Sequence, residues 1–382
     1  MNIKGEQKCV MVIAGDTSGD HHGAKLVQAM REKNGNLFFC GIGGQALKAA
    51  GVRLLLDTSA LSVIGVTEIF SKIHHFLGGI RRAKSIIQSL NPDLLILIDF
   101  PGFNLPFSAI AKRYGVKILY YIGPQVWAWR QGRVKKIRRR IDHMAVILPF
   151  EVDFFTQHGI PVSYVGHPLL DTHQYLIDSS PADDAENSRT IGLLPGSRDR
   201  EIERHLPEML DAAQILNRRL QGVRFAISLA PSVNRDVFDE KLRKHAAGID
   251  YQLISDGVEN VFRQCGFAVV CSGTVTLEAA LCGVPMVIMY KLSPITAWLG
   301  RTLVKGVDFI GLVNLIAGKG LAPELIQEDA TSQKIADTVY HMIQDEAGMK
   351  ALKRELLDIR DRLGGPGAAE RTADIALKMM DH

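Results

Sequence analysis

A short segment near residue 272 has the residue types that bind a diphosphate. An apolar run ending at Cys271 leads into Ser272, Gly273 and Thr274, and a predicted helix follows. Backbone amides and the helix dipole favour an anion at such a strand-to-helix turn. Glu278, in the first turns of that helix, could accept hydrogen bonds from a ribose diol, or it could simply compensate the helix dipole. No lysine follows the glycine, so the segment is not a Walker loop.

A second candidate for anion binding follows another predicted strand, at residues 194–198. Gly196 and Ser197 are small residues ahead of a predicted helix, and Arg198 adds a forked donor. A surface arginine in a turn is the plainer alternative. The position at the carboxyl end of a strand favours a phosphate contact, because ligands of parallel sheets bind at that edge.

Carboxylates follow two apolar runs in the first half of the chain. Asp99 ends a nearly continuous apolar run, where burial would raise its pKa and suit it to act as a general base. Asp16 and Ser18 lie in the loop after the first predicted strand. Capping of the following helix is the alternative for Asp99, and for Ser18 or Asp20 in the earlier loop.

The segment 41–46 formally matches a dinucleotide-binding fingerprint. It places Gly41, Gly43 and Ala46 between a predicted strand and a predicted helix. The acidic residue expected roughly 20 positions later is missing, since the first acid after the loop is Asp57, which resembles a turn residue. A tight strand-to-helix turn is therefore favoured over a nicotinamide site, and no cofactor is predicted.

Two further segments could contact a membrane or a polyanion. The run 130–140 begins at Arg130, contains no acid and follows Trp127, so it could bind anionic headgroups or single-stranded nucleic acid. A solvated helix face is the alternative. The second segment has apolar residues at helical spacing with basic flanks, which suits either a membrane interface or a core-facing helix. Its apolar positions are Val66, Phe70, Ile73, Leu77 and Ile80.

Most of these residues follow predicted strands. Apolar runs alternate with helical patterns, which predicts parallel sheets covered on both faces. The runs of the first half are 9–15, 37–41, 93–99, 117–122, 144–148 and 162–165. The runs of the second half are 190–194, 224–229, 252–254, 267–271 and 285–290. We therefore predict an α/β protein with two doubly wound, Rossmann-like domains and a ligand site at the carboxyl ends of the strands.

The segment between the two series is poor in apolar residues and suits a linker. We predict a first domain at 1–170, a linker at 171–189, a second domain at 190–350 and C-terminal helices at 351–382. A Gly-Gly-Pro-Gly break at 364–367 interrupts the last helical stretch. The terminal helices either cross back to the first domain or exchange with a partner chain, so a homodimer is left open.

The composition excludes several classes of protein. The 382 residues suit two domains, and the net charge of +4 does not by itself indicate nucleic-acid binding. Five cysteines without a CxxC pair indicate a reducing compartment and no zinc or iron–sulfur site. We expect no metal site, no signal peptide and no spanning helix, so that any membrane contact is peripheral.

Together these motifs resemble those of the bacterial lipid A disaccharide synthase family, a glycosyltransferase family of the GT-B fold. The resemblance covers nearly the whole chain, and its motifs occur in order. They are segments 18–20, 98–104, 124–130, 148–151, 165–168, 194–198 and 272–274, with Glu278. The first loop of the family usually reads Ala-Gly-Glu, whereas this chain has Asp16, whose side chain is one methylene shorter.

The resemblance implies an inverting transfer from UDP-2,3-diacylglucosamine to 2,3-diacylglucosamine 1-phosphate (lipid X). The product is the β-1,6-linked disaccharide 1-phosphate, with release of UDP. By resemblance Asp99 is the first candidate for the base and Asp16 the second. The residues implied in donor binding are Arg198, Ser197, Ser272, Gly273, Thr274, Glu278 and Asn314.

The resemblance also assigns the remaining features to the acceptor and the membrane. Ser18, Trp127, Arg130 and the apolar stripe from Val66 would face the acceptor or the cytoplasmic surface of the inner membrane. No nucleic-acid partner is then expected. Two alternatives remain from the residues alone: a UDP-sugar 2-epimerase of similar architecture, and a non-catalytic nucleotide- or RNA-binding protein resting on the basic run.

Overall fold

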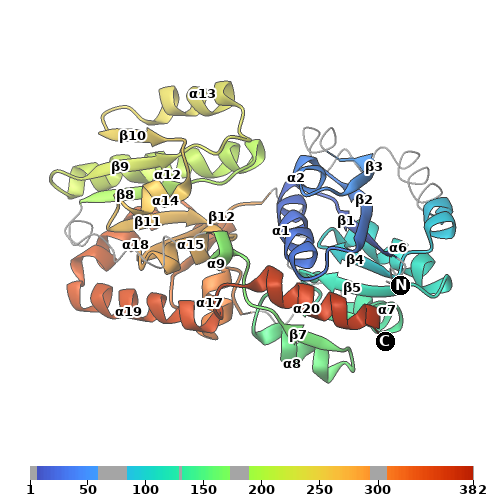
Figure 1. The fold of residues 1–382 in the computed structure, drawn as a ribbon. Helices are drawn as coiled ribbons and strands as arrows, with labels where there is room; N and C mark the ends of the chain where they lie inside the picture. Colours follow the sequence, from blue (N-terminus) through green and yellow to red (C-terminus); the bar gives the residue numbers. More distant parts are fainter. Residues whose placement is uncertain (1–6, 59–83, 129–130, 173–188, 293–307, 382) are drawn as a thin grey trace. The chain divides into compact units, whose positions relative to one another are not determined.

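The computed structural model describes residues 7–58, 84–128, 131–172, 189–292 and 308–381. The apolar stripe (Val66, Phe70, Ile73 and Leu77) and Arg130 lie outside these ranges. The chain divides into two compact α/β units (Figure 1). Unit 1 consists of Met1–Asp171 and Gly364–His382, and unit 2 of Thr172–Leu363.

Unit 1 is built on a seven-stranded parallel sheet with the order β3-β2-β1-β4-β5-β6-β7. Its strands are β1 (Lys8–Ala14), β2 (Leu37–Gly43), β3 (Arg53–Asp57), β4 (Leu94–Ile98), β5 (Lys117–Tyr121), β6 (His143–Val146) and β7 (Val162–Tyr164). The six predicted strands are confirmed. The edge strand β3 was not predicted, and Asp57 is its last residue and not a turn residue.

Helices cover both faces of this sheet, because successive side chains of a strand point to opposite faces. Val10, Val12 and Ala14 pack on one face with side chains of α1 and α20, whereas Met11 and Ile13 pack on the other with α6, α7 and α8. The helices of unit 1 are α1 (Thr17–Lys33), α2 (Gln45–Ala49), α6 (Pro101–Arg113), α7 (Val134–Arg140), α8 (Phe150–Gln157), α9 (Leu169–Thr172) and α20 (Ala368–Asp381), with a further helix at 84–90.

Unit 2 has a six-stranded parallel sheet with the order β10-β9-β8-β11-β12-β13. Its strands are β8 (Thr190–Leu194), β9 (Arg224–Ser228), β10 (Tyr251–Ile254), β11 (Phe267–Cys271), β12 (Met286–Tyr290) and β13 (Glu324–Ile326). The five predicted strands are confirmed, and the short edge strand β13 is an addition. The two parallel sheets confirm the predicted α/β class with two Rossmann-like units.

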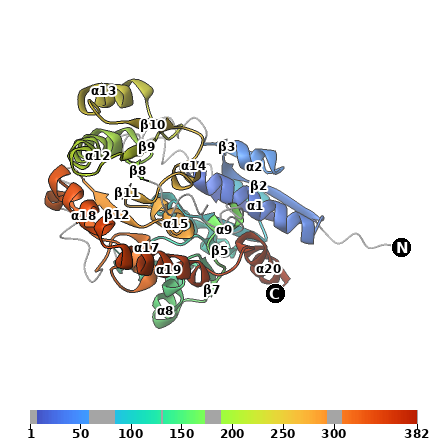
Figure 2. The same ribbon diagram turned by 90° about the vertical axis from the view of Figure 1, so that its left-hand side faces the viewer.

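The helices of unit 2 also form two layers around the sheet (Figure 2). One layer packs into the main core through α12, α13 and α18, and the other includes α15, which contacts α14, α17 and α19. These helices are α12 (Asp199–Arg219), α13 (Arg235–His245), α14 (Val258–Phe262), α15 (Val275–Leu281), α17 (Leu312–Ala317), α18 (Ser332–Gln344) and α19 (Glu346–Arg362).

The strand order of each sheet reverses at one point, and the candidate residues follow the strands at that point. In unit 1 the reversal lies between β1 and β4, and in unit 2 it lies between β8 and β11. Loops on either side of such a switch point diverge and leave room for a ligand. The topology therefore brings the Asp16 loop beside the Asp99 turn, and the 194–198 loop beside the 271–274 loop.

Candidate active site

Asp99 lies in a strained turn directly after β4. Asp99 and the next residue, Phe100, have φ angles of 41° and 46°, in the left-handed region that bulky side chains seldom adopt. Nδ2 of Asn104 donates to the carbonyl oxygens of Ile98 (3.1 Å) and Asp99 (2.6 Å), and the hydroxyl of Tyr120 donates to the Asp99 carbonyl (2.7 Å). Buried side chains thus hold the turn through its backbone.

Phe100 connects this turn to the loop that carries Asp16. A Cβ atom at Gly15 would lie 2.2 Å from the Phe100 ring, so only glycine lets the two loops approach this closely. Asp16 is the N-cap of α1 and accepts a hydrogen bond from Gly19 N at 2.8 Å. Ser18 is exposed in the first turn of α1.

The surroundings of Asp99 suit a general base. Burial, followed by the negative charge of Asp16, raises the pKa of Asp99 to about 6. A carboxyl group with such a pKa is mostly ionised at neutral pH, yet it holds a proton more strongly than an ordinary aspartate. The structure therefore brings together the two carboxylates that the sequence singled out.

Two histidines near Asp16 were not selected from the sequence. Burial lowers the pKa of His22 to about 4, and the charge of Lys25 adds to this effect. Burial, followed by the charge of His22, lowers the pKa of His167 to about 4. Nδ1 of His167 accepts a hydrogen bond from Leu169 N at 3.2 Å. Both rings are therefore neutral at neutral pH. The signal available in the sequence was the position of His22 within the first two turns of the helix that follows Asp16.

The glycine-rich segment 41–46 is occupied by an internal carboxylate. Asp20 is buried, and its oxygens accept from the amides of Gly44 (2.6 Å), Ala46 (2.8 Å) and Leu47 (3.2 Å). These amides are the groups that would bind a pyrophosphate in a dinucleotide site. The segment is a tight turn capped by Asp20, as favoured from the sequence.

In unit 2 the loop after β8 presents Arg198 at the surface. The Arg198 side chain is 74% exposed, and its Nη1 donates to Oε1 of Glu201 at 2.8 Å. The amide of Ser197 donates to the other oxygen of Glu201 at 2.9 Å. The expected anion-binding groups therefore lie together, and in this structure both bond to the same carboxylate.

The loop after β11 holds Ser272, Gly273 and Thr274. Gly273 has a φ of 155°, and a Cβ atom there would meet no atom within 4 Å, so the backbone is open on that side. The hydroxyl of Ser272 donates to the Ile310 carbonyl at 3.1 Å, which ties this loop to the segment before α17. Burial raises the pKa of Glu278, on α15, to about 7, and the charge of Glu259 adds to this effect.

Asn314 lies near the start of α17, and its side chain is fully buried. Nδ2 donates to the Ala322 carbonyl and to Glu324, both at 2.8 Å, while Oδ1 accepts from the amides of Leu321 and Ala322, both at 2.9 Å. All four bonding positions of the amide are used, so Asn314 holds the loop between α17 and β13.

Trp127 is also held within unit 1. Its indole N–H donates to Oε1 of Glu151 at 3.1 Å, and its ring meets Phe150 edge-on with centroids 4.9 Å apart. Glu151 is only 1% exposed, and burial raises its pKa to about 7. Glu151 was not selected from the sequence, although it belongs to the 148–151 motif.

Residues 134–140 of the basic run form α7, which carries four exposed cations and the half-buried Arg140. Lys135, Lys136, Arg138 and Arg139 are exposed. Arg140 instead donates to the Leu105 carbonyl at 2.8 Å and ties α7 to α6. The exposed cations therefore form a basic face, and the buried Val134 and Ile137 anchor the helix.

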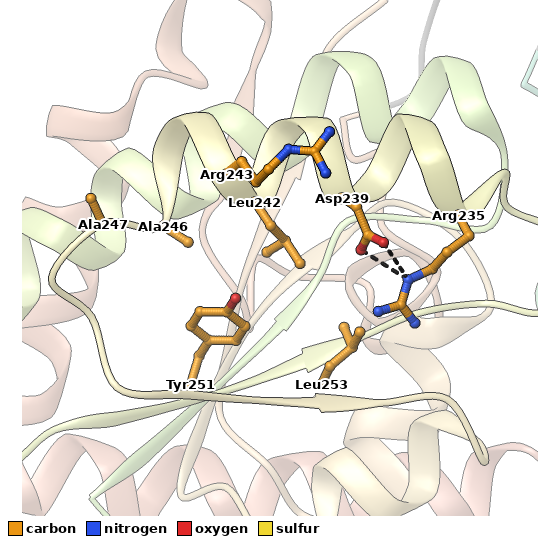
Figure 3. Close-up of a pocket in the computed structure, with 8 residues that line it drawn as sticks. All are labelled: Arg235, Asp239, Leu242, Arg243, Ala246, Ala247, Tyr251 and Leu253. Atoms are coloured by element: carbon orange, nitrogen blue, oxygen red, sulfur yellow. Dashed lines mark hydrogen bonds and ion pairs between the residues drawn. The ribbon is translucent and has the colours of Figure 1, made fainter.

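A pocket of about 490 Å³ lies at the edge of unit 2, between α13 and β10 (Figure 3). Leu242 and Leu253 line its middle, and Arg235 pairs with Asp239 at 2.8 Å. β10 is the edge strand, and β9 separates it from β8. The pocket includes none of the predicted site residues.

Two further observations concern the ranges that the structure describes. There, no three His, Cys, Asp or Glu side chains group as metal ligands would. Within the same ranges, no helix is both long enough and apolar enough to cross a membrane.

The fold and the switch-point loops define a class of protein. MurG from Acinetobacter baumannii has a similar structure, with a TM-score of 0.59 and 13% identity over 97% of this chain and 99% of that one. UDP-GlcNAc 2-epimerase from Neisseria meningitidis, bound to UDP-GlcNAc, gives a TM-score of 0.66 and 11% identity over 97% and 100%. At such identities the likeness concerns the fold alone, which is that of the GT-B class.

The sequence then identifies the family within that class. The family model for Lipid-A-disaccharide synthetase matches residues 10–377. Lipid-A-disaccharide synthase from Trichlorobacter lovleyi is 44% identical over 383 residues, 99% of each chain. The chain therefore belongs to the lipid-A-disaccharide synthase family and is a glycosyltransferase of lipid A biosynthesis. The epimerase and the non-catalytic alternatives are set aside.

Proposed function

We propose that the enzyme transfers 2,3-diacylglucosamine from UDP-2,3-diacylglucosamine to the 6-hydroxyl of lipid X. The products are the β-1,6-linked disaccharide 1-phosphate and UDP. This proposal names the donor and acceptor within the family's activity. It is carried by one observation, the Asp99 turn: a carboxylate with a raised pKa, fixed through its backbone at the switch point of a Rossmann-like sheet.

In the proposed step Asp99 is the general base. Its carboxylate takes the proton of the acceptor hydroxyl as the hydroxyl oxygen attacks the anomeric carbon of the donor sugar. The bond from that carbon to the diphosphate breaks, and UDP leaves with the bonding electron pair. Attack opposite the leaving group converts an α-linked donor into a β-linked product, by the logic of inverting sugar chemistry. Asp16 supports this role because its charge raises the pKa of Asp99.

We assign donor binding to the switch point of unit 2. Arg198 and the Ser197 amide would hold the diphosphate together with Ser272, Gly273 and Thr274, and Glu278 would accept from the ribose diol. Asn314 would act indirectly, since its side chain is used within its own loop. The related fold of an epimerase bound to UDP-GlcNAc is consistent with nucleotide binding to this architecture.

The first experiment measures UDP release from UDP-2,3-diacylglucosamine with and without lipid X. The variant Asp99→Asn should lower kcat by about 100-fold or more, the usual cost of losing a general base. Asp153→Asn is the matched control, because Asp153 is an exposed carboxylate on α8 of the same unit. A folded wild-type enzyme that releases no UDP in response to lipid X would overturn the proposal. An active Asp99→Asn enzyme would move the base to another residue.

We further propose that the basic face of α7 docks on the anionic cytoplasmic surface of the inner membrane, where both lipid substrates reside. Each lysine or arginine near an anionic membrane surface contributes roughly 1 kcal/mol to the free energy of binding. Reversal of Lys135, Arg138 and Arg139 to glutamate should abolish flotation with phosphatidylglycerol vesicles. Arg243→Glu with Lys244→Glu is the control, since both are exposed on α13 in unit 2. Unchanged flotation of the α7 variant would refute the docking.

A further inference from the structure

The loop after β8 contains an internal anion at the position proposed for the donor's diphosphate. The two oxygens of Glu201 accept from the Ser197 amide (2.9 Å) and from Nη1 of Arg198 (2.8 Å). These are the two donors assigned to the diphosphate. One carboxylate of the chain itself therefore bonds to both of them.

The backbone is shaped to admit this carboxylate. Gly196 has a φ of 121°, and a Cβ atom there would lie 2.4 Å from Oε2 of Glu201. A side chain at position 196 would therefore exclude the carboxylate. Glu201 is 16% exposed, whereas Arg198 is 74% exposed. The pair is thus open to solvent on the arginine side, where an incoming anion would arrive.

The charge of Glu201 reaches the neighbouring strand ends. Burial, followed by the charge of Glu201, raises the pKa of Cys271 to about 12, and the same two causes raise the pKa of Tyr290. Cys271 ends β11 and Tyr290 ends β12. A diphosphate bound by the loops at these ends would therefore meet the field of Glu201.

We propose that Glu201 is a stand-in anion: the donor's diphosphate displaces it from Ser197 and Arg198, and it returns as UDP leaves. This inference rests on the proposed function, because it takes the diphosphate to bind at Arg198. An ion pair this exposed is weak enough to exchange readily. Glu201 would thereby weaken the binding of donor and product alike and speed the release of UDP.

Two other roles for Glu201 make different predictions. Arg198 is the N-cap of α12 and Glu201 is the third residue of that helix, where Glu or Gln commonly bonds back to the preceding amides. If capping were its only role, Glu201→Gln would leave UDP affinity unchanged. If Glu201 oriented Arg198 for the nucleotide, Glu201→Gln would weaken UDP binding. Displacement alone predicts tighter binding.

The test is calorimetric titration of Glu201→Gln with UDP and with uridine. Glutamine keeps the size of the side chain and its capacity to cap the helix, and it removes the charge. We expect the Kd for UDP to fall about two- to fivefold, as loss of a competing exposed ion pair would allow. The Kd for uridine should not change, because uridine has no phosphate. Steady-state kinetics should show a lower KM for the donor and stronger product inhibition by UDP.

Glu203→Gln is the matched control, since it removes the same charge from the exposed side of the same helix. It should leave both affinities at the wild-type value. A Glu201→Gln protein of normal thermal stability that binds UDP equally or more weakly than wild type would overturn the inference. Wild-type protein that fails to bind UDP at all would instead overturn the proposed function.

Discussion

At the residue scale, the proposed base is positioned through its main chain. Asn104 and Tyr120 bond to the carbonyl of Asp99 and not to its carboxylate, so the turn is fixed while the carboxylate remains available to a substrate. Two consecutive left-handed residues cost free energy, which the buried hydrogen bonds and the packing of Phe100 on Gly15 offset. Strain of this kind commonly accompanies a functional side chain.

The pH dependence of the reaction should report the Asp16–Asp99 pair. Because a base must be deprotonated to accept a proton, kcat/KM should fall as the pH drops below about 6, the pKa of Asp99. Asp16→Asn removes the negative charge that helps to raise this pKa, so the acid limb should move to lower pH. Asparagine is also a good N-cap, so α1 should keep its start. A pH–rate profile of both enzymes checks this, and an acid limb that stays in place would show that Asp16 does not act on the base.

The contact between Gly15 and Phe100 should control kcat. In Gly15→Ala the new methyl would lie 2.2 Å from the ring, so the Asp99 turn must shift. A misplaced base commonly costs about tenfold or more in rate, and we expect that loss in kcat with little change in KM. Gly102→Ala is the control, because a Cβ there meets nothing within 4 Å.

The double variant Gly15→Ala/Phe100→Ala separates the clash from other effects. Removal of the ring should restore part of the activity lost in Gly15→Ala, so that the two changes are not additive. Additive losses would mean that Gly15 acts through something other than the ring of Phe100.

At the element scale, α12 connects the 194–198 loop to the end of β12. His205 on this helix is fully buried; its Nδ1 bonds to the Pro195 carbonyl at 2.8 Å, and its Nε2 bonds to Lys291 N at 3.0 Å. The Pro195 carbonyl can only accept, so Nδ1 carries a proton. Nε2 lies closer to the Lys291 amide (3.0 Å) than to the Lys291 carbonyl (3.3 Å), and the amide can only donate to it. Burial lowers the pKa of His205, which keeps the ring in this form at neutral pH.

His205→Phe should weaken UDP binding about fivefold or more, because the 194–198 loop loses its attachment to α12. It should also lower the free energy of unfolding by about 1–3 kcal/mol, since the Pro195 carbonyl and the Lys291 amide lose a buried partner. His245→Phe serves as the control, because His245 is the last residue of α13 and bonds to Asp211 of α12 at 2.8 Å. Equal UDP affinity in the two variants would contradict a positioning role for His205.

The strands could be predicted from sequence, but several contacts of the site could not. Buried strands are continuous apolar runs, so β4 and β11 are visible in the sequence, whereas the partly exposed edge strands β3 and β13 are not. Asp99 was visible because it ends such a run. The Asp20 contacts depend on where two loops converge in space, and no spacing rule reports that. Glu201 stands at the third position of α12, where a bond back to a preceding amide is common, but its pairing with Arg198 depends on the geometry of the loop. The bonds of Asn314 were not visible either, since its partners lie in the following loop.

At the scale of the whole molecule, the chain returns to its first unit after completing the second. α20 packs against α1 and belongs to unit 1. Asp171, at the end of the first segment of this unit, accepts from the amides of Gly367 (2.6 Å) and Ala368 (3.1 Å) at the start of α20. Arg371 of α20 donates to the Val165 carbonyl at 2.8 Å. The segment that leaves unit 1 after Asp171 and the segment that returns to it before α20 are thus hydrogen-bonded to each other within unit 1.

Asp171→Ala should therefore destabilise unit 1. Loss of a side-chain cap should lower the free energy of unfolding by about 1–2 kcal/mol. The segment 364–367 before α20 should then become more sensitive to proteolysis. Asp374→Ala is the control. Asp374 is also on α20, and it pairs with Lys33 of α1 at the surface, where an ion pair contributes little to stability. Denaturant unfolding and limited proteolysis compare the two. Because α20 packs on α1 and Asp16 is the N-cap of α1, release of α20 should also lower kcat. UDP affinity, which is assigned to unit 2, should remain at the wild-type value. If Asp171→Ala unfolded like Asp374→Ala, the attachment of α20 would rest on its apolar contacts with α1 and not on this cap.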